Sequence, residues 1–536
     1  MMNRRELIRL ATLSAGLQGL SSGAYSQVKP KGNPFKLGIA SGSPTADGVV
    51  LWTKLVTDNL LGYSNAPIEV RFEVANDENF KSLVLQGTAL ALPQLDYSVH
   101  QELRGLQADR WYFYRFILGD AVSDVGRTRT APALGSPADK LRFAFASCQH
   151  WEHGYYAAYR QMVADNPDLI VFLGDYIYES ATPRKRTAGF VRFHDLPTAT
   201  TLDDYRDRYA MHKSDPFLQA AHRAAPWIVT WDDHEVENDY ANDLSKHLTP
   251  IPEFLARRAA AYQAFYEHMP LPASALTRGL AGLGSNDGVR VTQRLRWGQL
   301  TNFHVLDCRQ YRDHQACPPP GKSGANVVQA NQCPALFDPN RTLLGKPQEQ
   351  WLAQGLGLDT LQGAASQAMP WSVIAQSTLY SQFDSLKGSE QRFWTDGWDG
   401  YAATRQRLSS EMARLGGNNA DFHPVFIGGD VHHNVVATIK TDFNKPESKA
   451  IATEFCGTSM TSFSGFKQAE MDGLYGENPH VAYMNSEKRG YALCDVTPKL
   501  WTTTLMGVDD ITRANSATRP IAKFAVERGN KTPVKA

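Results

Sequence analysis

The sequence has few cysteines, no excess of either charge and no long apolar run. Its 536 residues include six cysteines, too few for disulfide bonds to hold a fold of this size together. Lysine plus arginine and aspartate plus glutamate number 55 each, so no overall basic field indicates nucleic acid as a partner. No run of about 18 or more apolar residues follows the N-terminus, and we expect no membrane span.

The N-terminal segment, residues 1–26, has the features of an export signal. Arg4 and Arg5 precede a modestly apolar run, 10–20, and residues 24–26 (Ala-Tyr-Ser) offer a small-x-small cleavage site. Paired arginines with a weak apolar region predict a Tat-type signal peptide rather than a Sec one. We therefore expect export by the Tat machinery to the periplasm or out of the cell. The alternative is a disordered cationic tail.

Short strands and turns dominate residues 33–131. Three segments, 49–53, 68–74 and 111–116, are enriched in β-branched and aromatic residues, and the last two alternate in character. Their spacing fits a small Ig-like or fibronectin-III-like sandwich. We expect no chemistry there, and a linker at 131–137 ends this domain.

The pattern beyond the linker indicates an α/β catalytic domain at 140–515 and a C-terminal tail at 516–536. An apolar run at 141–147, an amphipathic stretch at 154–165 and a second apolar run at 169–173 form a βαβ unit. Further helices are expected at 202–211, 253–268, 347–357 and 400–415, and further strands at 227–231, 301–306, 371–375, 424–428, 450–455 and 491–496.

Residue types that bind metals recur at the ends of four apolar runs. Cys148, Asp175, the stretch 232–235 and the stretch 430–433 each directly follow such a run. Strands of an α/β sheet deliver their carboxyl ends to one rim, where such sheets usually build their sites. The four groups are therefore expected to converge.

Asp175 is the strongest single candidate. Gly174 before it removes side-chain bulk where a metal must approach, and a carboxylate can bridge two cations. Tyr178 follows at i+3; a phenol, with a pKa near 10, binds best to a trivalent cation, which argues for ferric iron. A thiolate at Cys148 also suits iron. The alternatives are a capping aspartate, a tyrosine packed over it and a buried structural cysteine.

Adjacent acids follow the third apolar run. The carboxylates of Asp232 and Asp233 repel each other unless cations or donors compensate them, and Asp233 is the ligand candidate. His234 is better suited to donate a proton to a leaving oxygen, held near the cluster but not on it. Asn238 and Asp239 offer oxygens to a harder ion such as calcium, or they are a loop or helix-capping pair.

The fourth apolar run ends in Asp430 and two histidines. Asp430 and His432 point the same way if the local chain is extended, and His433 then faces away as a weaker candidate. A buried structural histidine is the alternative for either imidazole. His150, near Cys148 in sequence, is also a weaker candidate.

Two arginines lie on the predicted helix at 202–211. Arg206 and Arg208 could bind a phosphate oxygen. The alternative is a solvated helix face whose charges pair at i,i+3 and i,i+4.

The loop-rich segment 312–345 borders the predicted site and contains two of the six cysteines. In an exported protein Cys317 and Cys333 can form a disulfide, and Cys308 is a competing partner. The sequence leaves this pairing open.

Together these motifs resemble the PhoD-like alkaline phosphatases, which are calcineurin-like metallophosphoesterases of the bacterial periplasm and cell surface. The resemblance covers most of the chain, from the export signal and the opening of the sandwich to the chemistry-bearing motifs. Those motifs are Ala146–Cys148, Gly174–Glu179, Trp231–Asn238 and Gly429–Asn434.

The resemblance implies an α/β fold of the α+β sandwich kind: a four-layer metallophosphoesterase core preceded by the small all-β domain. It also implies a ferric ion held by Cys148, Asp175 and Tyr178. Calcium is implied nearby, with Asp175 as the bridge and Asn238 and Asp430 contributing.

Asp233 and His432 join this set as metal candidates, although their division with His433 between metal and phosphate stays open. The wider superfamily has an Asn-His pair where this chain has Asp233-His234, and Gly-His-x-His where it has Gly-Asp-Val-His. Both departures are typical of the PhoD branch.

The predicted function is an exported, metal-dependent phosphoesterase in which a metal-bound hydroxide attacks the ester. Asp233 and His234 are the catalytic candidates. Its substrate is a small phosphate ester or a phospholipid- or teichoic-type diester, and the closest alternative is a phosphodiesterase or phospholipase D-like enzyme. More distant alternatives are a non-catalytic surface protein that binds through its sandwich and a redox protein with a Cys/Tyr iron site. A monomer is expected.

Overall fold

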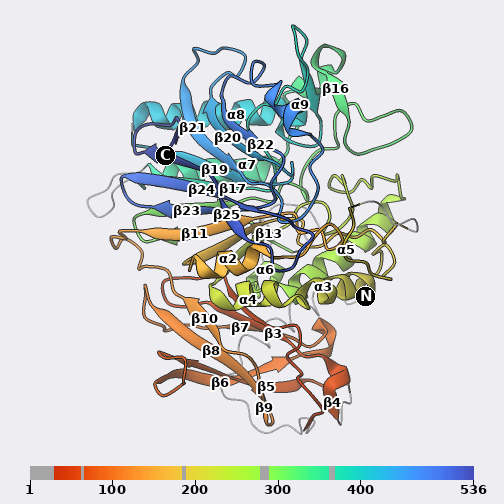
Figure 1. The fold of residues 1–536 in the computed structure, drawn as a ribbon, viewed down its shortest axis with the longest axis vertical. Helices are drawn as coiled ribbons and strands as arrows, with labels where there is room; N and C mark the ends of the chain where they lie inside the picture. Colours follow the sequence, from red (N-terminus) through yellow and green to blue (C-terminus); the bar gives the residue numbers. More distant parts are fainter. Residues whose placement is uncertain (1–28, 62–64, 184–188, 278–288, 361–368, 420) are drawn as a thin grey trace.

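The computed structural model describes residues 29–61, 65–183, 189–277, 289–360, 369–419 and 421–536. The predicted export signal, 1–26, lies outside the described residues. Two large sheets stack face to face, helices cover their outer faces, and a smaller β-domain lies at the N-terminal end (Figure 1). Among the described residues, no helix has both the length and the apolar character needed to cross a membrane.

The first large sheet has ten strands and a parallel centre. Its strands β11, β12 and β13 run parallel, and the strands on one side of them are antiparallel. In sequence order the strands of this part are β11 (Leu141–Ala146), β12 (Leu169–Leu173), β13 (Trp227–Thr230), β23 (Gly490–Val496), β24 (Leu500–Val508), β25 (Thr518–Glu527) and β26 (Val534–Lys535).

The second sheet has seven strands, of which β15, β17, β19 and β21 are parallel neighbours. In spatial order its strands are β14 (Gln293–Trp297), β15 (Thr301–Val305), β17 (Trp371–Ala375), β19 (Pro424–Gly428), β21 (Ala450–Cys456), β20 (Asn434–Lys440) and β22 (Val481–Asn485).

The parallel strands are apolar on both faces, because each face is covered. In β12, Leu169 and Val171 pack between the two sheets, whereas Ile170 and Phe172 pack under the helices. The four layers are therefore helix, sheet, sheet and helix, as the predicted fold class requires.

Four predicted helices are present with bounds shifted by at most three residues, and the one predicted within 154–165 covers only 158–164. The helices at 216–224, 274–277 and 468–472 were not predicted. On the ten-stranded sheet lie α2 (Ala158–Ala164), α3 (Leu202–Lys213), α4 (Pro216–Ala224) and α5 (Ile251–His268); on the seven-stranded sheet lie α7 (Lys346–Asp359) and α8 (Ala402–Asn418); α6 (Ser274–Thr277) and α9 (Gln468–Asp472) are short. The start of α3 is fixed by a capping box, in which Thr201 Oγ1 accepts from the Asp204 amide and Asp204 Oδ2 accepts from the Thr201 amide.

The N-terminal domain is a two-layer all-β unit that shares a sheet with the rest of the molecule. One layer contains β5 (Ile68–Ala75), β6 (Leu83–Ala91), β8 (Trp111–Leu118), β9 (Ala121–Val122) and β10 (Gly126–Arg129), and the other contains β2 (Ile39–Gly42), β3 (Val50–Lys54) and β7 (Ser98–Glu102). The second layer extends the ten-stranded sheet, because β2 pairs with β13 at Gly42 and Trp227. A Cβ at Gly42 would lie 2.8 Å from the Trp227 carbonyl oxygen, so the join has no room for a side chain.

The expectation of a C-terminal tail at 516–536 is wrong. Most of this segment forms β25, and residues 534–535 form β26, at the edge of the ten-stranded sheet. Ala522, Phe524 and Val526 alternate inward and bury their side chains in the core between the sheets. The catalytic domain therefore extends beyond residue 515.

The segment 312–345 is irregular but well anchored. Cys317 and Cys333 form a disulfide with a Cα–Cα distance of 6.2 Å, while Cys308 is a buried free thiol. Next to the disulfide, β16 (Val327–Gln329) pairs with β18 (Arg392–Trp394) in a two-stranded ribbon. This ribbon forms one wall of the cavity described next.

Candidate metal centre

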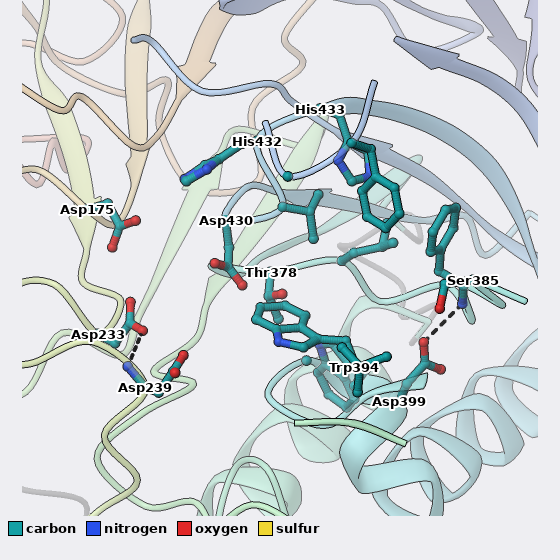
Figure 2. A pocket seen from close by; sticks show the side chains of 18 of the residues that line it. Asp175, Asp233, Asp239, Thr378, Ser385, Trp394, Asp399, Asp430, His432 and His433 are labelled. Carbon is teal, nitrogen blue, oxygen red and sulfur yellow. Dashed lines mark hydrogen bonds between the residues drawn. The ribbon is translucent and has the colours of Figure 1, made fainter. Parts of the chain in front are cut away.

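A cavity of about 550 Å³ opens where strands of both large sheets end. The residues after β12, β13 and β19 supply its acids and imidazoles, and Cys148 follows β11. Figure 2 shows Asp175 and Asp233 on one side of the cavity, with Asp430 and His432 facing them. The predicted convergence of distant segments is therefore present.

The chain leaves these strands in an unusual backbone conformation. Five residues that carry the acids, thiol and imidazole have φ between 55° and 65°: Cys148, Asp175, Asp239, Asp430 and His432. A left-handed conformation costs a non-glycine residue on the order of 1–3 kcal/mol and collects at functional sites. Gly174 has φ 106°, and a Cβ there would lie 2.6 Å from the Asp232 amide nitrogen, so only glycine fits.

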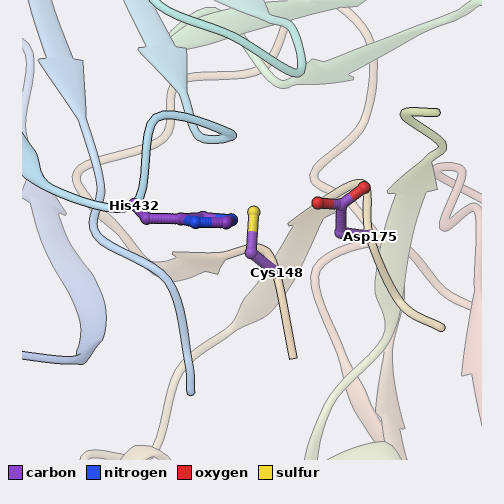
Figure 3. Close-up of side chains that lie close together, drawn as sticks. All are labelled: Cys148, Asp175 and His432. Carbon is purple, nitrogen blue, oxygen red and sulfur yellow. The ribbon is translucent and has the colours of Figure 1, made fainter. Parts of the chain in front are cut away.

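The first group of ligand-type atoms lies at the end of β11 and β12. One ligand atom each from Cys148, Asp175 and His432 lies within 4.8 Å of the others. Figure 3 shows these three side chains close together. The Tyr178 hydroxyl donates to Asp175 Oδ2 at 2.9 Å and lies 3.4 Å from His432 Nε2. A thiol, a carboxylate, a phenol and an imidazole thus share one small volume.

The expectation of an extended chain at 430–433 is wrong. Asp430 and His432 both have positive φ, so the side chains do not alternate as in a strand. Asp430, His432 and His433 all line the cavity, and His433 does not face away from it. The Nδ1 atom of His432 contacts the Phe463 carbonyl oxygen at 2.8 Å, which leaves its Nε2 toward Tyr178.

The second group adds Asp233 and His234 to Asp175. His234 Nδ1 lies 2.7 Å from Glu179 Oε2, and Glu179 Oε1 also accepts from the Asn238 amide at 2.9 Å. Burial opposes a charge on His234, but the carboxylates of Glu179, Asp175 and Asp233 outweigh it and raise the pKa well above its usual range. The imidazole is therefore held in its protonated form.

The third group contains Asp233, Asp239 and Asp396, and it has cations of its own. Arg309 is fully buried and lies 2.7 Å from Asp396, 2.6 Å from Asp232 and 3.4 Å from Asp233. Arg312 pairs with Asp396 at 2.8 Å, and Lys246 pairs with Asp239 at 2.6 Å. Cationic side chains of the protein itself therefore compensate the charge of these acids.

Buried carboxylate oxygens without a hydrogen-bond partner in this part of the site fit a cation. Asp175 Oδ1, Asp233 Oδ1 and Asp430 Oδ2 are buried and make no hydrogen bond, which is costly for a carboxylate oxygen. Burial raises the pKa of Asp175, Asp430 and Cys148 well above the usual ranges, so without a cation these groups resist ionisation. Hard carboxylates and a phenol beside a soft thiol are a donor set that suits iron, with room for a second, harder ion.

Two weaker candidates, His150 and Arg206, lie outside this arrangement. His150 stacks on His153 at 3.7 Å and lies behind the Tyr178 ring. Arg206 pairs with the buried Glu267 of α5 through two contacts of 2.7 Å and with Asp203 at i,i+3, so its guanidinium is engaged within the protein and not at the cavity.

Arg208 does not bind at the cavity either. It is buried and donates to the carbonyl oxygens of Tyr178, Ser180 and Pro197, which fixes the loop after Tyr178. Its role in the structure is to hold the segment that carries the phenol.

Sequence reasoning missed several residues of the site. The Glu235 carboxylate accepts hydrogen bonds from the backbone amides of Asp175, Tyr176 and Asp232 and so fixes the chain after β12 and β13. It lies inside the motif Trp231–Asn238, so the sequence could have indicated it. Ser462, whose Oγ lies 2.6 Å from the Tyr178 hydroxyl, follows no apolar run and carried no signal. Asp396 also follows no apolar run, whereas Arg309 lies shortly after the strand predicted at 301–306.

Known proteins share both the fold and the motifs. The PhoD-like phosphatase family matches residues 143–505, and the N-terminal domain of PhoD-like phosphatases matches residues 21–132. Alkaline phosphatase D of Bacillus subtilis (strain 168) is 40% identical over 540 residues, which cover 98% of this chain and 88% of that protein. A solved structure described as "Structure of PhoD" has a TM-score of 0.84 and 39% identity, and the match covers 96% of this chain and 93% of that chain.

The fold, the clustered acids and these matches define a phosphoric ester hydrolase. The family match spans more than half of the chain, and the Bacillus relative matches nearly all of it. This chain belongs to the PhoD-like phosphatase family. The predicted resemblance, fold class and enzyme class are confirmed.

Proposed function

We propose that this chain is an exported phosphoesterase that depends on ferric iron and calcium. The observation that carries the proposal is the position of Asp175, which belongs to two groups of ligand-type atoms at once. A carboxylate shared in this way can bridge two cations. The unpartnered Asp175 Oδ1 supports the same role, because a buried carboxylate oxygen needs a partner.

The donor types favour a division between the two cations. Cys148, Tyr178 and His432, with one oxygen of Asp175, offer the thiolate, phenolate and imidazole that iron accepts. Asp430 and the carbonyl oxygen of the Asn238 side chain, both on the cavity wall, are oxygen donors of the kind that calcium takes.

Asp233 is the remaining acid of the pair that follows β13. Its Oδ1 is buried and makes no hydrogen bond, while its Oδ2 accepts from the Asp239 amide at 2.6 Å. We assign it to the calcium side, where it also stabilises the charged form of His234.

The bound cations supply positive charge to the phosphoryl oxygens and lower the pKa of water. The Nδ1–H of His234 donates to the Glu179 carboxylate, and the raised pKa of His234 keeps a second proton on Nε2. It lines the cavity and is placed to give that proton to the departing alcohol oxygen. Glu179 keeps the imidazole oriented and charged until the ester opens.

A second substrate class has a specific observation behind it. The cavity of about 550 Å³ is larger than a phosphate group and continues beyond the acids, so a phosphodiester with two organic substituents also has space. Turnover of 4-nitrophenyl phosphate and bis(4-nitrophenyl) phosphate under one set of conditions decides between monoesterase and diesterase.

The decisive experiment for the cations is metal analysis of protein purified without chelator. We expect iron and calcium to copurify, and we expect chelation to abolish turnover until both are returned. Active protein that contains neither metal would contradict the proposal.

Export is proposed from the sequence of residues 1–26 alone. Fusing this segment to a reporter that is active only when exported folded gives the test. We expect export with Arg4 and Arg5 intact, and loss of export when both are changed to lysine.

A further inference from the structure

The cavity has an apolar end that no proposed chemical step uses. Away from the acids, its wall is formed by Val327, Phe383, Trp394, Val431 and Phe466. Figure 2 shows Trp394 and His433 beyond Asp430 and Thr378, on the side away from Asp175. The charged and apolar ends belong to one continuous space.

These apolar side chains are not part of the sealed core. Phe383, Trp394, Val431 and Phe466 are only partly buried, and Val327 is 54% exposed. Several large apolar groups facing one hollow leave apolar surface in water, which a ligand can cover. Such a hollow usually fixes an organic group while a few polar atoms fix its orientation.

Aromatic rings form one side of this end. Phe383 and Phe466 meet edge to face with ring centroids 5.9 Å apart, and His433 meets Phe466 edge to face at 5.8 Å. Mutual ring contacts hold this side in one arrangement.

The opposite side comes from the β16–β18 ribbon, which carries Val327 and Trp394. The Cys317–Cys333 disulfide anchors the chain that leads into this ribbon. Both sides are therefore held in place without a ligand, so binding costs little conformational entropy.

The charged groups at this end are already engaged within the protein. Arg392 donates through Nη2 to the Ser385 carbonyl oxygen at 2.6 Å and through Nε to Ser385 Oγ at 3.1 Å. Asp399 accepts from the Phe383 amide at 3.0 Å and pairs with Arg405. What remains for a ligand is mainly apolar and aromatic surface.

We propose that this end binds the alcohol portion of the phosphate ester, and that the preferred alcohol is flat and apolar, such as an aryl group. The inference rests on the proposed phosphoesterase function. A phosphoryl group at the acids places its ester oxygen near His234, and the alcohol then extends between Trp394 and the Phe383–Phe466 pair. Trp394 and Phe466 act as specificity-determining residues and take no part in the chemistry.

The test compares two phosphomonoesters with different alcohols, 1-naphthyl phosphate and glycerol 3-phosphate. We expect kcat/KM to be higher for the naphthyl ester. Trp394→Ala should lower kcat/KM for that ester about tenfold, an effect of the size expected for losing one large apolar contact. For the glycerol ester the same variant should change kcat/KM less than about twofold, so the ratio between the esters reports the subsite.

Two further variants serve as a second test and as a control. Phe466→Ala removes the opposite side and should lower the same ratio, which keeps the test usable if Trp394→Ala does not fold. Phe337→Ala is the matched control, because Phe337 is a 54% exposed aromatic residue near the disulfide that does not line the cavity.

The possible failures are distinguishable. Equal kcat/KM for both esters, or a ratio that neither variant changes, overturns the inference and leaves the phosphoesterase function standing. If neither ester is hydrolysed, the proposed function fails, and calorimetric titration with 1-naphthol then decides the subsite separately. Binding that Trp394→Ala and Phe466→Ala weaken supports the subsite, and binding that they leave unchanged overturns it.

Discussion

Two neighbouring parts of the site differ in how their negative charge is compensated. Cys148, Asp175 and Tyr178 contact no cationic side chain other than His234 in the part of the chain that the structure describes. Around Asp396, the guanidinium groups of Arg309 and Arg312 lie within 3 Å of the carboxylates.

The difference indicates which part needs a cation from outside. Burial without a partner favours the neutral form of a carboxylic acid, so a bound metal stabilises its charged form. An acid already paired with arginine gains much less from a metal, and its pair instead fixes the loops on which the site is built. The first three of the four predictions below test this division.

The largest effect is expected where a single carboxylate serves two groups. Asp175→Ala should lower kcat at least about 1,000-fold and remove bound metal, because both cations lose a ligand. Activity assays and metal analysis of the same sample check it. Asp203→Ala, at a highly exposed position on α3, is the matched control and should behave as wild type. Full activity and metal content in Asp175→Ala would refute the bridging role.

The arginine-filled part should respond through stability instead. Arg309→Met keeps the length of the side chain but leaves buried carboxylates unpaired, and we expect the free energy of unfolding to fall by about 3–5 kcal/mol. Urea titration with and without chelator measures it, and the loss should be the same in both. Arg414→Met on the exposed face of α8 is the control, with an expected change below about 1 kcal/mol. A loss seen only in the presence of metal would place Arg309 on the cation-dependent side.

A smaller and more specific effect is expected at Tyr178. Tyr178→Phe removes one oxygen that lies 2.9 Å from Asp175 Oδ2 and keeps the ring. Visible absorption from a phenolate–ferric pair should disappear, and kcat should fall at least about tenfold, because a ligand that tunes the metal is lost. Tyr155→Phe, at a residue that does not line the cavity, should keep the band. An unchanged spectrum would remove the phenol from the iron site.

The fourth prediction concerns a buried histidine outside both parts and is confined to acid pH. His100 stacks on Tyr266 and contacts the Leu271 carbonyl oxygen at 3.1 Å, and burial lowers its pKa to about 3. The unfolded chain takes up a proton below pH about 6.5, which the folded chain resists, so stability is lost as pH falls from there toward 3.

His100→Gln should therefore make the free energy of unfolding less dependent on pH between about 6.5 and 3, by up to about 1.4 kcal/mol per pH unit. Urea titrations at several pH values in that window measure it. His314→Gln, at a half-exposed surface site, is the control. An equal pH dependence in wild type and His100→Gln would show that this histidine does not contribute.

The sequence was informative where apolar runs end in chemistry-bearing residues. The runs before Cys148 and Asp175 are the parallel strands β11 and β12, and parallel neighbours bring their following residues together. The same reasoning is blind to Asp396, which follows no such run, and it passed over Arg309, which lies shortly after the strand predicted at 301–306. Only the folded chain brings them to Asp233.

Two errors have local physical causes. The positive φ of His432 cannot be inferred from an Asp-Val-His-His stretch, so the extended-chain assumption failed there. The supposed tail contains Pro520, which lies at a register shift between β24 and β25, where a proline is tolerated. The alternation of Ala522, Phe524 and Val526 was the better guide.

The join between β2 and β13 has a practical consequence for anyone who trims this protein. Cutting the chain at the 131–137 linker removes β2 and leaves β13 as an uncovered edge of the ten-stranded sheet. It also removes Trp52, whose indole donates to the Glu267 carbonyl oxygen at 3.1 Å. An unprotected edge recruits strands from other molecules, so the hydrolase half produced alone is expected to precipitate.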